Sequence, residues 1–337
     1  MSEPVIEVEN LRVWYSGSGG PVRAVDGVDF VLRPGEVLGL VGESGCGKST
    51  LGRGLMGLLP PGAAVGGTIR FDGQSLLEEP VKVRNRNRGS GIGLIFQEPM
   101  TRLDPLMRVS DHFDEALKRH EKRLSKKERE IRALDSLRAL GIPPTRYRNY
   151  PHEFSGGMRQ RIMIALALAL RPKFIIADEP TTALDVLVEA QILRILAEIG
   201  EKFSTAILLI THNLGIIAEA CDRVAVMYAG RIVEQGPVRD VFASPAHPYT
   251  RELLRSTISL TTKELHSIPG APPDLVQPPP GCNFHPRCPS AMLICARTPP
   301  PPRDVGAQRV ECWLHETVAP QDAQPLTPLE VLVADEA

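Results

Sequence analysis

Residues 42–49 read GESGCGKS, a glycine-rich stretch that ends in lysine and serine. The stretch fits the pattern G-x-x-x-x-G-K-[ST], and a short apolar run, VLGLV at 37–41, leads directly into it. From Thr50 onward the pattern becomes helical. A strand, a glycine loop and a helix in this order predict a loop whose backbone N–H groups surround phosphate, with the positive end of the helix behind it.

The side chains of this loop have expected partners in a bound nucleotide. Lys48 is expected to reach the β- and γ-phosphates, and the hydroxyl of Ser49 is expected to bind Mg²⁺. Cys46 is interpreted as a small side chain that fills the loop. The predicted nucleotide-binding residues of the loop are Gly42, Ser44, Gly45, Cys46, Gly47, Lys48, Ser49 and Thr50.

A second acidic element follows the apolar run FIIA at 174–177. Asp178 and Glu179 emerge at the carboxyl end of this predicted strand, where ligands bind in open α/β sheets. Asp178 is predicted to hold Mg²⁺, directly or through water, and Glu179 to polarise the attacking water. The glycine loop and this acidic pair together predict a nucleotide hydrolase.

Ser155, Gly156 and Gly157 open another helix, which continues through MRQRIMIALALAL at 158–170. Its N-terminus presents backbone N–H groups that have no partner within the helix, and such an end favours an anion. One chain with one phosphate loop has no second phosphate to offer. The helix end is therefore predicted to face the γ-phosphate held by a different chain.

In this order the motifs resemble those of the ATP-binding subunits of ABC transporters, whose signature LSGGQ appears here as FSGGM at 154–158. The resemblance covers residues 5 to about 240. Phe154 and Met158 depart from the commonest Leu and Gln, and Asn213 stands where Asp is more usual. Since the serine and both glycines are kept, the resemblance implies a competent site for ATP and Mg²⁺.

The resemblance also implies roles for four residues outside the motifs above. Tyr15 matches the aromatic residue that stacks on adenine, and Gln97 matches the Q-loop glutamine, which binds nucleotide and Mg²⁺. Asp185 matches the D-loop aspartate. His212 matches the switch histidine, which acts with Glu179 on the attacking water and the γ-phosphate.

Strands alternating with helices predict an α/β protein with a largely parallel sheet. Apolar runs at 92–97, 174–177, 206–210 and 223–228 are the expected buried strands, with a helix at 185–202. The resemblance implies a P-loop, RecA-like ABC ATPase domain over residues 1–240, with a helical subdomain at about 98–170. A loop-rich C-terminal extension is expected at 241–337, because twelve of the 31 prolines lie within 269–302 and exclude long helices there.

Composition limits the class of partner. Lys and Arg number 39 and Asp and Glu 40, so no global field favours nucleic acid. The N-terminus lacks the apolar segment of a signal peptide. The longest apolar run, 162–170, is far shorter than the roughly 20 residues that span a bilayer. We expect a chain that is soluble and peripheral, on the cytoplasmic face of the inner membrane.

Further stretches resemble the oligopeptide/dipeptide importer branch: FSGGMRQR at 154–161, EPMTRLDP at 98–105, HPYTRELL at 247–254 and the cysteine-bearing extension. In that branch two different, homologous ATPase subunits pair beneath two transmembrane permeases, and an external substrate-binding protein delivers the substrate. Close relatives import nickel, glutathione or oligosaccharides and remain alternatives, although the long extension favours peptides over nickel. An ABC ATPase without a membrane partner is a further alternative, but the coiled-coil insertion or second fused ATPase domain of such proteins is absent.

Four of the six cysteines lie in the proline-rich extension: Cys282, Cys288, Cys295 and Cys312. A cytosolic compartment argues against structural disulfides. Structural zinc sites usually include C-x₂₋₄-C pairs, which are absent, whereas a [4Fe–4S] cluster accepts widely spaced ligands. The residues alone leave zinc, a cluster and unligated thiols open. The resemblance implies the cluster, because some peptide-importer subunits bind [4Fe–4S] through C-terminal cysteines.

Overall fold

The computed structural model describes residues 3–78, 87–95, 103–180, 186–256 and 267–326. Its contacts divide the chain into two compact units, each built from several stretches. The first unit comprises residues 1–7, 31–38 and 69–211, and the second comprises residues 8–30, 39–68 and 212–337. The predicted division into a domain at 1–240 and an extension at 241–337 stays a prediction.

Parallel strands form the centre of the first unit. They are β6 (Ile92–Ile95), β7 (Phe174–Asp178) and β8 (Ala206–Ile210), and β7 pairs with both neighbours. Every residue of β7 and β8 is buried, which explains their uninterrupted apolar sequences. Since Asp178 lies opposite Ile210, the carboxyl ends of β7 and β8 share one edge.

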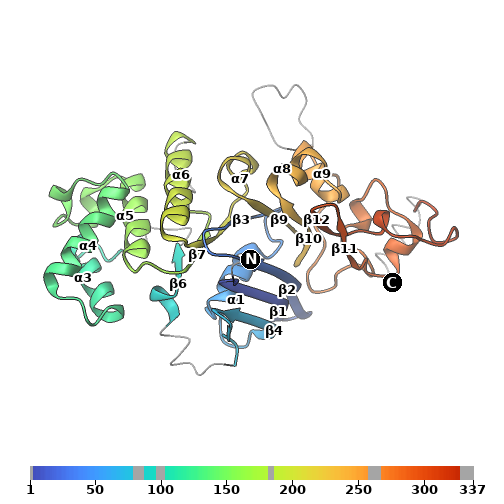
Figure 1. The fold of residues 1–337 in the computed structure, drawn as a ribbon. Helices are drawn as coiled ribbons and strands as arrows, with labels where there is room; N and C mark the ends of the chain where they lie inside the picture. Colours follow the sequence, from blue (N-terminus) through green and yellow to red (C-terminus); the bar gives the residue numbers. More distant parts are fainter. Residues whose placement is uncertain (1–2, 79–86, 96–102, 181–185, 257–266, 327–337) are drawn as a thin grey trace. The chain divides into compact units, whose positions relative to one another are not determined.

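A group of helices occupies the region where the helical subdomain is expected. Helices α3 (Val109–His120), α4 (Lys126–Ala139) and α5 (Gly156–Ala169) pack against one another (Figure 1). Helix α4 begins with a capping box, in which Ser125 and Glu128 each bond the other's backbone N–H. The first unit also contains α6 (Val186–Phe203) and the short strand β5 (Gln74–Ser75), which forms a hairpin with the end of β4.

Strands β1 (Ile6–Gly17), β2 (Gly20–Leu32) and β4 (Ala64–Phe71) are neighbours in the order β2-β1-β4. Buried residues are interspersed with partly or fully exposed ones along β1 and β2, so these strands are half-buried. Helix α1 (Lys48–Leu55) follows the glycine loop, as expected. Among the described residues, no helix is both long and apolar enough to cross a membrane.

The C-terminal region, residues 267–326, contributes the strands β11 (Pro302–Val305) and β12 (Gln308–Glu311). With β10 (Arg231–Pro237), β9 (Arg223–Tyr228) and β3 (Val37–Val41), they are neighbours in the order β11-β12-β10-β9-β3. Strand β9 pairs with β10 in the antiparallel sense, so the predicted parallel arrangement does not extend to that side of β9. Residues after 240 were predicted to be loop-rich, and the β11–β12 hairpin within them was not foreseen.

Aromatic residues form a small core where β9, α9 (Pro248–Arg255) and the C-terminal region meet. The ring centroids of Tyr228 and Tyr249 lie 4.5 Å apart, and those of Phe284 lie 5.1 and 5.3 Å from them. His247 precedes α9 and is 1% exposed, and its Nδ1 accepts a hydrogen bond of 3.0 Å from the Tyr249 N–H. Burial, together with the nearby His315, lowers the pKa of His247 to about 3.

Because His247 is buried in its neutral form, we expect the folded chain to lose stability in acid. Because the folded-state pKa lies below the ordinary value of 6.5, the unfolded chain takes up the proton first as the pH falls. The stability contributed by neutral His247 is complete above about pH 6.5 and is lost toward pH 3, at no more than about 1.4 kcal/mol per pH unit.

We expect His247→Asn to be less sensitive to acid than the wild-type chain. The amide oxygen of asparagine can accept the same N–H at the start of α9 but does not titrate. Thermal unfolding midpoints at about pH 7 and about pH 5 measure the effect, and the wild-type midpoint should fall further. An equal fall in the two proteins would contradict the assigned role of His247.

Candidate nucleotide site

The glycine loop between β3 and α1 passes very close to the neighbouring backbone. Gly42 and Gly47 have φ values of 154° and 109°. A Cβ would lie 2.1 Å from the Met227 carbonyl oxygen at Gly42 and 2.0 Å from the Ala24 carbonyl oxygen at Gly47. Only glycine satisfies both the conformation and the space at these two positions. The backbone of Cys46 is held as well, because its carbonyl accepts a hydrogen bond of 2.9 Å from the Gly230 N–H.

Lys48 lies across this loop. Its Nζ donates to the carbonyl oxygens of Gly42 at 2.7 Å and of Glu43 at 3.0 Å, and the residue is 8% exposed. Gly47 caps α1 and has no side chain to occupy the first N–H groups of the helix. A cation and uncapped helix amides in one loop form the arrangement that holds phosphate.

Two more predicted residues come together at the loop. The Tyr15 hydroxyl donates to the Thr50 hydroxyl at 3.4 Å, which places the predicted adenine-stacking residue beside the start of α1. Ser44 and Gly45 are exposed at the loop surface. Burial raises the pKa of Cys46 above its ordinary value, so this thiol stays protonated, as expected of a side chain that only fills space.

The acidic pair lies at the carboxyl end of β7, in the first unit. Asp178 is 7% exposed, and the Glu179 N–H donates to the Ile210 carbonyl oxygen at 2.9 Å. Glu179 has a φ of 44°, in the left-handed region that costs a non-glycine residue about 1 kcal/mol or more. The bond to the end of β8 holds this conformation.

Helix α5 begins as the SGG motif predicts. The Ser155 hydroxyl accepts a hydrogen bond of 3.4 Å from the Met158 N–H, so the serine caps the helix. Ser155 and Gly156 are exposed, and a Cβ at Gly156 would meet nothing within 4 Å. Further along α5, the buried Gln160 donates to the Pro180 carbonyl oxygen, which ties this helix to the segment just after Glu179.

Gln97 and Asp185 lie outside the described residues. His212 is exposed, immediately before α7 (Leu214–Ala220). Asn213 caps α7, because its Oδ1 accepts from the N–H groups of Gly215 at 3.1 Å and Ile216 at 3.4 Å.

The predicted catalytic and Mg²⁺-binding residues are divided between the two units. Asp178 and Glu179 belong to the first unit, whereas Ser49 and His212 belong to the second. That these residues meet around one nucleotide stays a prediction.

Comparison with known proteins identifies the family. Residues 25–182 match the family model described as ABC transporter, and residues 233–295 match that of the oligopeptide/dipeptide transporter C-terminal region. The dipeptide transport ATP-binding protein DppD of Bacillus subtilis is 48% identical over 321 residues, which cover 93% of this chain and 96% of that protein. The chain belongs to the ATP-binding proteins of ABC transporters, in their oligopeptide/dipeptide branch.

Other members of the ABC family agree with this assignment. The oligopeptide transport ATP-binding protein OppD of Salmonella typhimurium is 50% identical over 300 residues, covering 88% of this chain and 89% of that protein. A dimeric ABC cassette, MJ0796, solved in a post-hydrolysis state with ADP and phosphate, superposes with a TM-score of 0.63. It is 26% identical and covers 69% of this chain and 99% of its own length. The predicted ABC ATPase fold is confirmed.

As an ABC ATPase the chain binds ATP and Mg²⁺. The donor types fit the metal, because the hydroxyl of Ser49 and the carboxylate of Asp178 are the hard oxygen ligands that Mg²⁺ prefers. The hydroxyl directly follows the lysine of the phosphate loop, and the carboxylate ends a buried strand.

The prediction of a metal-binding [4Fe–4S] site at Cys282, Cys288, Cys295 and Cys312 is wrong, and the zinc alternative fails with it. In the described part of the chain, which includes all four cysteines, no group of three or more His, Cys, Asp or Glu side chains is arranged to hold a metal ion. Burial raises the pKa of Cys282 and Cys288 to about 12 and of Cys312 to about 11, and it also raises the pKa of Cys295. Since the thiolate is the metal-binding form, burial disfavours ligation here.

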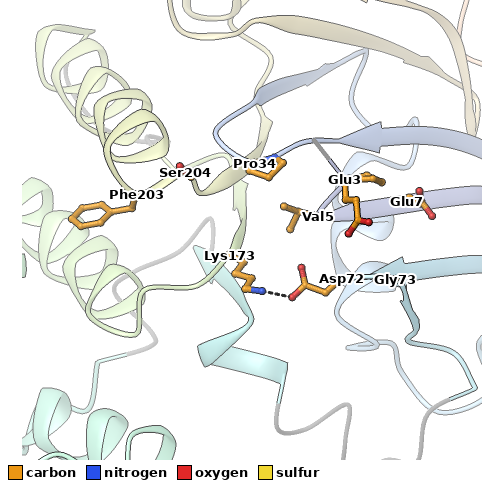
Figure 2. A pocket seen from close by; sticks show the side chains of 10 residues that line it. Glu3, Val5, Glu7, Pro34, Asp72, Gly73, Lys173, Phe203 and Ser204 are labelled. Atoms are coloured by element: carbon orange, nitrogen blue, oxygen red, sulfur yellow. Dashed lines mark hydrogen bonds and ion pairs between the residues drawn. The ribbon is translucent and has the colours of Figure 1, made fainter. Parts of the chain in front are cut away.

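A hollow of about 770 Å³ in the first unit is not the nucleotide site. Figure 2 shows Lys173 and Asp72 on its wall, with the Lys173 Nζ 2.5 Å from the Asp72 carboxylate. Lys173 immediately precedes β7, so the hollow lies at the amino end of that strand. Nucleotides bind at the carboxyl ends of such strands, where Asp178 lies.

Sequence reasoning missed two residues that contact Glu43 at the start of the glycine loop, Tyr249 and Arg287. The Glu43 N–H donates to the Tyr249 hydroxyl at 2.9 Å, and the Glu43 carboxylate pairs with Arg287. Their separations of 206 and 244 positions along the chain leave no local pattern that could have revealed them.

Proposed function

We propose that the chain is the ATP-hydrolysing subunit that powers import of dipeptides and oligopeptides across the cytoplasmic membrane. The match of residues 233–295 to the C-terminal region of oligopeptide/dipeptide transporters carries this proposal. Relatives of 48% and 50% identity are named as dipeptide and oligopeptide transport ATP-binding proteins. The glycine loop and the acidic edge of β7 supply the groups that ATP hydrolysis requires.

The residues divide the work of hydrolysis between binding and water activation. Lys48 and the amides at the start of α1 hold the phosphates, and Tyr15 stacks on the adenine. Ser49, Gln97 and Asp178 are the proposed ligands of Mg²⁺, which would offset phosphate charge when bound. Glu179 accepts a hydrogen bond from the attacking water and orients it, and His212 contacts the γ-phosphate.

A second, homologous ATPase subunit completes each site. The exposed N-terminus of α5 caps the γ-phosphate held by the partner, and the partner's corresponding helix caps the phosphate held here. The dimeric form of MJ0796 supports pairing of this kind.

The ATPase pair docks peripherally on the cytoplasmic face of two transmembrane permeases, to which an external binding protein delivers peptides. The stretch 98–104, after the predicted Q-loop, is the proposed contact with the permeases. Leu106 follows it and is 85% exposed, while its N–H bonds the Asp104 carboxylate at 2.9 Å. An apolar side chain held out on a fixed turn suits a protein contact.

Reconstitution with the partner ATPase and permeases in proteoliposomes tests the proposal. The binding protein loaded with a dipeptide or a longer peptide should stimulate ATP hydrolysis and drive peptide accumulation. Lys48→Ala should remove both effects, because the phosphates lose their cation. Stimulation by nickel, glutathione or an oligosaccharide, with none by peptides, would refute the peptide assignment while leaving the ATPase assignment intact.

A further inference from the structure

An ion pair connects the C-terminal region to the phosphate loop. Arg287 ends the short 3₁₀ helix His285–Arg287, and Glu43 is the second residue of the loop. Nη1 of Arg287 lies 2.7 Å from Oε2 of Glu43, and Nη2 lies 3.0 Å from Oε1. The two contacts form a bidentate pair, the stronger and more directional form of this interaction. The Arg287 side chain is only 5% exposed and that of Glu43 25% exposed, so water screens the pair weakly.

The Arg287 guanidinium is also held by groups outside the loop. Its Nε donates to the Pro269 carbonyl oxygen at 2.8 Å, and Nη2 also donates to the Ile268 carbonyl oxygen at 3.3 Å. Nη1 donates to the Tyr228 hydroxyl at 3.3 Å. Burial opposes the charge, but the bonds to Glu43 and Tyr228 raise the pKa of Arg287 above its ordinary value. Arg287 is therefore a fixed cation, and its position is set by the C-terminal region and β9.

Glu43 is held at its other polar groups as well. Its N–H donates to the Tyr249 hydroxyl, and its carbonyl oxygen accepts from Lys48 at 3.0 Å and from the Cys46 N–H at 3.3 Å. The carboxylate belongs to the same loop that receives the triphosphate. Without a cation beside it, this negative charge would repel the nucleotide and be free to attract Lys48 away from the phosphates.

We propose that Arg287 is a positioning residue for nucleotide binding, through which the C-terminal region neutralises Glu43 and holds the phosphate loop in its receptive shape. The proposal rests on the ATP-binding part of the proposed function and is independent of the transported substrate. It assigns the C-terminal region a role in this chain's own affinity for nucleotide. By linkage, bound nucleotide stabilises the C-terminal region to the same extent.

Nucleotide titration of the full-length chain tests this role. Fluorescence titration with Mg²⁺ and an N-methylanthraniloyl-labelled ADP gives the dissociation constant of each variant. Arg287→Gln should raise this constant at least about tenfold, because the variant leaves the Glu43 charge partly buried and unpaired. Glu43→Gln alone should stay within about threefold of the wild-type chain, and Glu43→Gln combined with Arg287→Gln should recover most of the lost affinity.

A matched control comes from the same region of the chain. Arg303 pairs with Glu316, and its side chain is 60% exposed. Arg303→Gln removes an arginine–carboxylate pair of the same chemistry that includes no residue of the loop, and it should leave the dissociation constant unchanged. Rescue by Glu43→Gln in the Arg287→Gln background is the deciding result, because it removes the unpaired charge but does not repair a misfolded region.

Several outcomes would overturn the proposal. An unchanged dissociation constant in Arg287→Gln is one. A loss of affinity that Glu43→Gln does not recover is another, since it indicates a general loss of structure in the C-terminal region. If Arg287→Gln does not fold, Arg287→Lys carries the test. It keeps the charge but lacks the bidentate fork, so affinity should fall by about threefold and return with Glu43→Gln. A wild-type chain that binds no nucleotide would refute the proposed function itself.

Discussion

Glu179→Gln is expected to bind ATP as tightly as the wild-type chain and to hydrolyse it at least about 100-fold more slowly. An amide of the same shape keeps the packing, but its oxygen accepts a hydrogen bond from the attacking water less strongly than a carboxylate oxygen does. The turn at residue 179 is held by its backbone bond to Ile210, which the substitution leaves in place. A loss of hydrolysis rate without a loss of ATP binding would therefore be due to the missing carboxylate and not to a change in the surrounding fold.

Single-turnover ATP hydrolysis and equilibrium nucleotide binding, measured on the same protein, separate the two effects. The slow variant should also accumulate as an ATP-bound pair with its partner subunit, visible as a larger species in gel filtration. Glu78→Gln is a suitable control, because Glu78 is exposed in the same unit and lies outside the motifs. Hydrolysis at the wild-type rate would show that another group activates the water.

The local sequence was sufficient to predict those elements that burial and turn geometry determine over a few residues. The runs at 37–41, 206–210 and 223–228 match β3, β8 and β9 to the residue, because buried strands are continuous apolar runs between turns. The glycine loop could also be predicted from the sequence, since Gly42 and Gly47 approach the neighbouring backbone too closely for any other residue to replace them. The helix cap at Ser155 follows the same local logic.

Contacts between residues far apart in the sequence could not be predicted from local patterns. The β11–β12 hairpin lies next to a run of prolines that suggested loops alone, and its pairing with β10 joins Val310 to Glu234 across the chain. The partnership of Arg287 with Glu43 has no local signature either.

The cysteine prediction failed for a related reason. Spacing and family resemblance describe which thiols are present, but ligation also requires a converging arrangement and deprotonated sulfur. The described structure provides no such metal-binding group, and burial holds the thiols in their neutral form.

Gly156→Asp should weaken ATP-driven closure with the partner subunit at least about 100-fold while leaving nucleotide binding at this chain's own phosphate loop within about twofold of wild type. A Cβ at Gly156 meets nothing within 4 Å, so the isolated chain has room for the new side chain. A carboxylate in the first turn of α5 also stabilises that helix, by about 0.3–1 kcal/mol. Any loss of closure therefore cannot be assigned to damage within this chain.

The expected defect arises at the contact with the other subunit. There the aspartate would bring a negative charge against the partner's γ-phosphate and occupy the N–H groups that the phosphate needs. Dimer formation in the Glu179→Gln background, followed by light scattering as ATP is added, should fall at least about 100-fold in apparent affinity. Gly156→Asn has nearly the same size without the charge and should retain much more closure. If Gly156→Asp weakened nucleotide binding and closure equally, the SGG helix would belong to this chain's own site, and the proposal that it acts on the partner's nucleotide would fail.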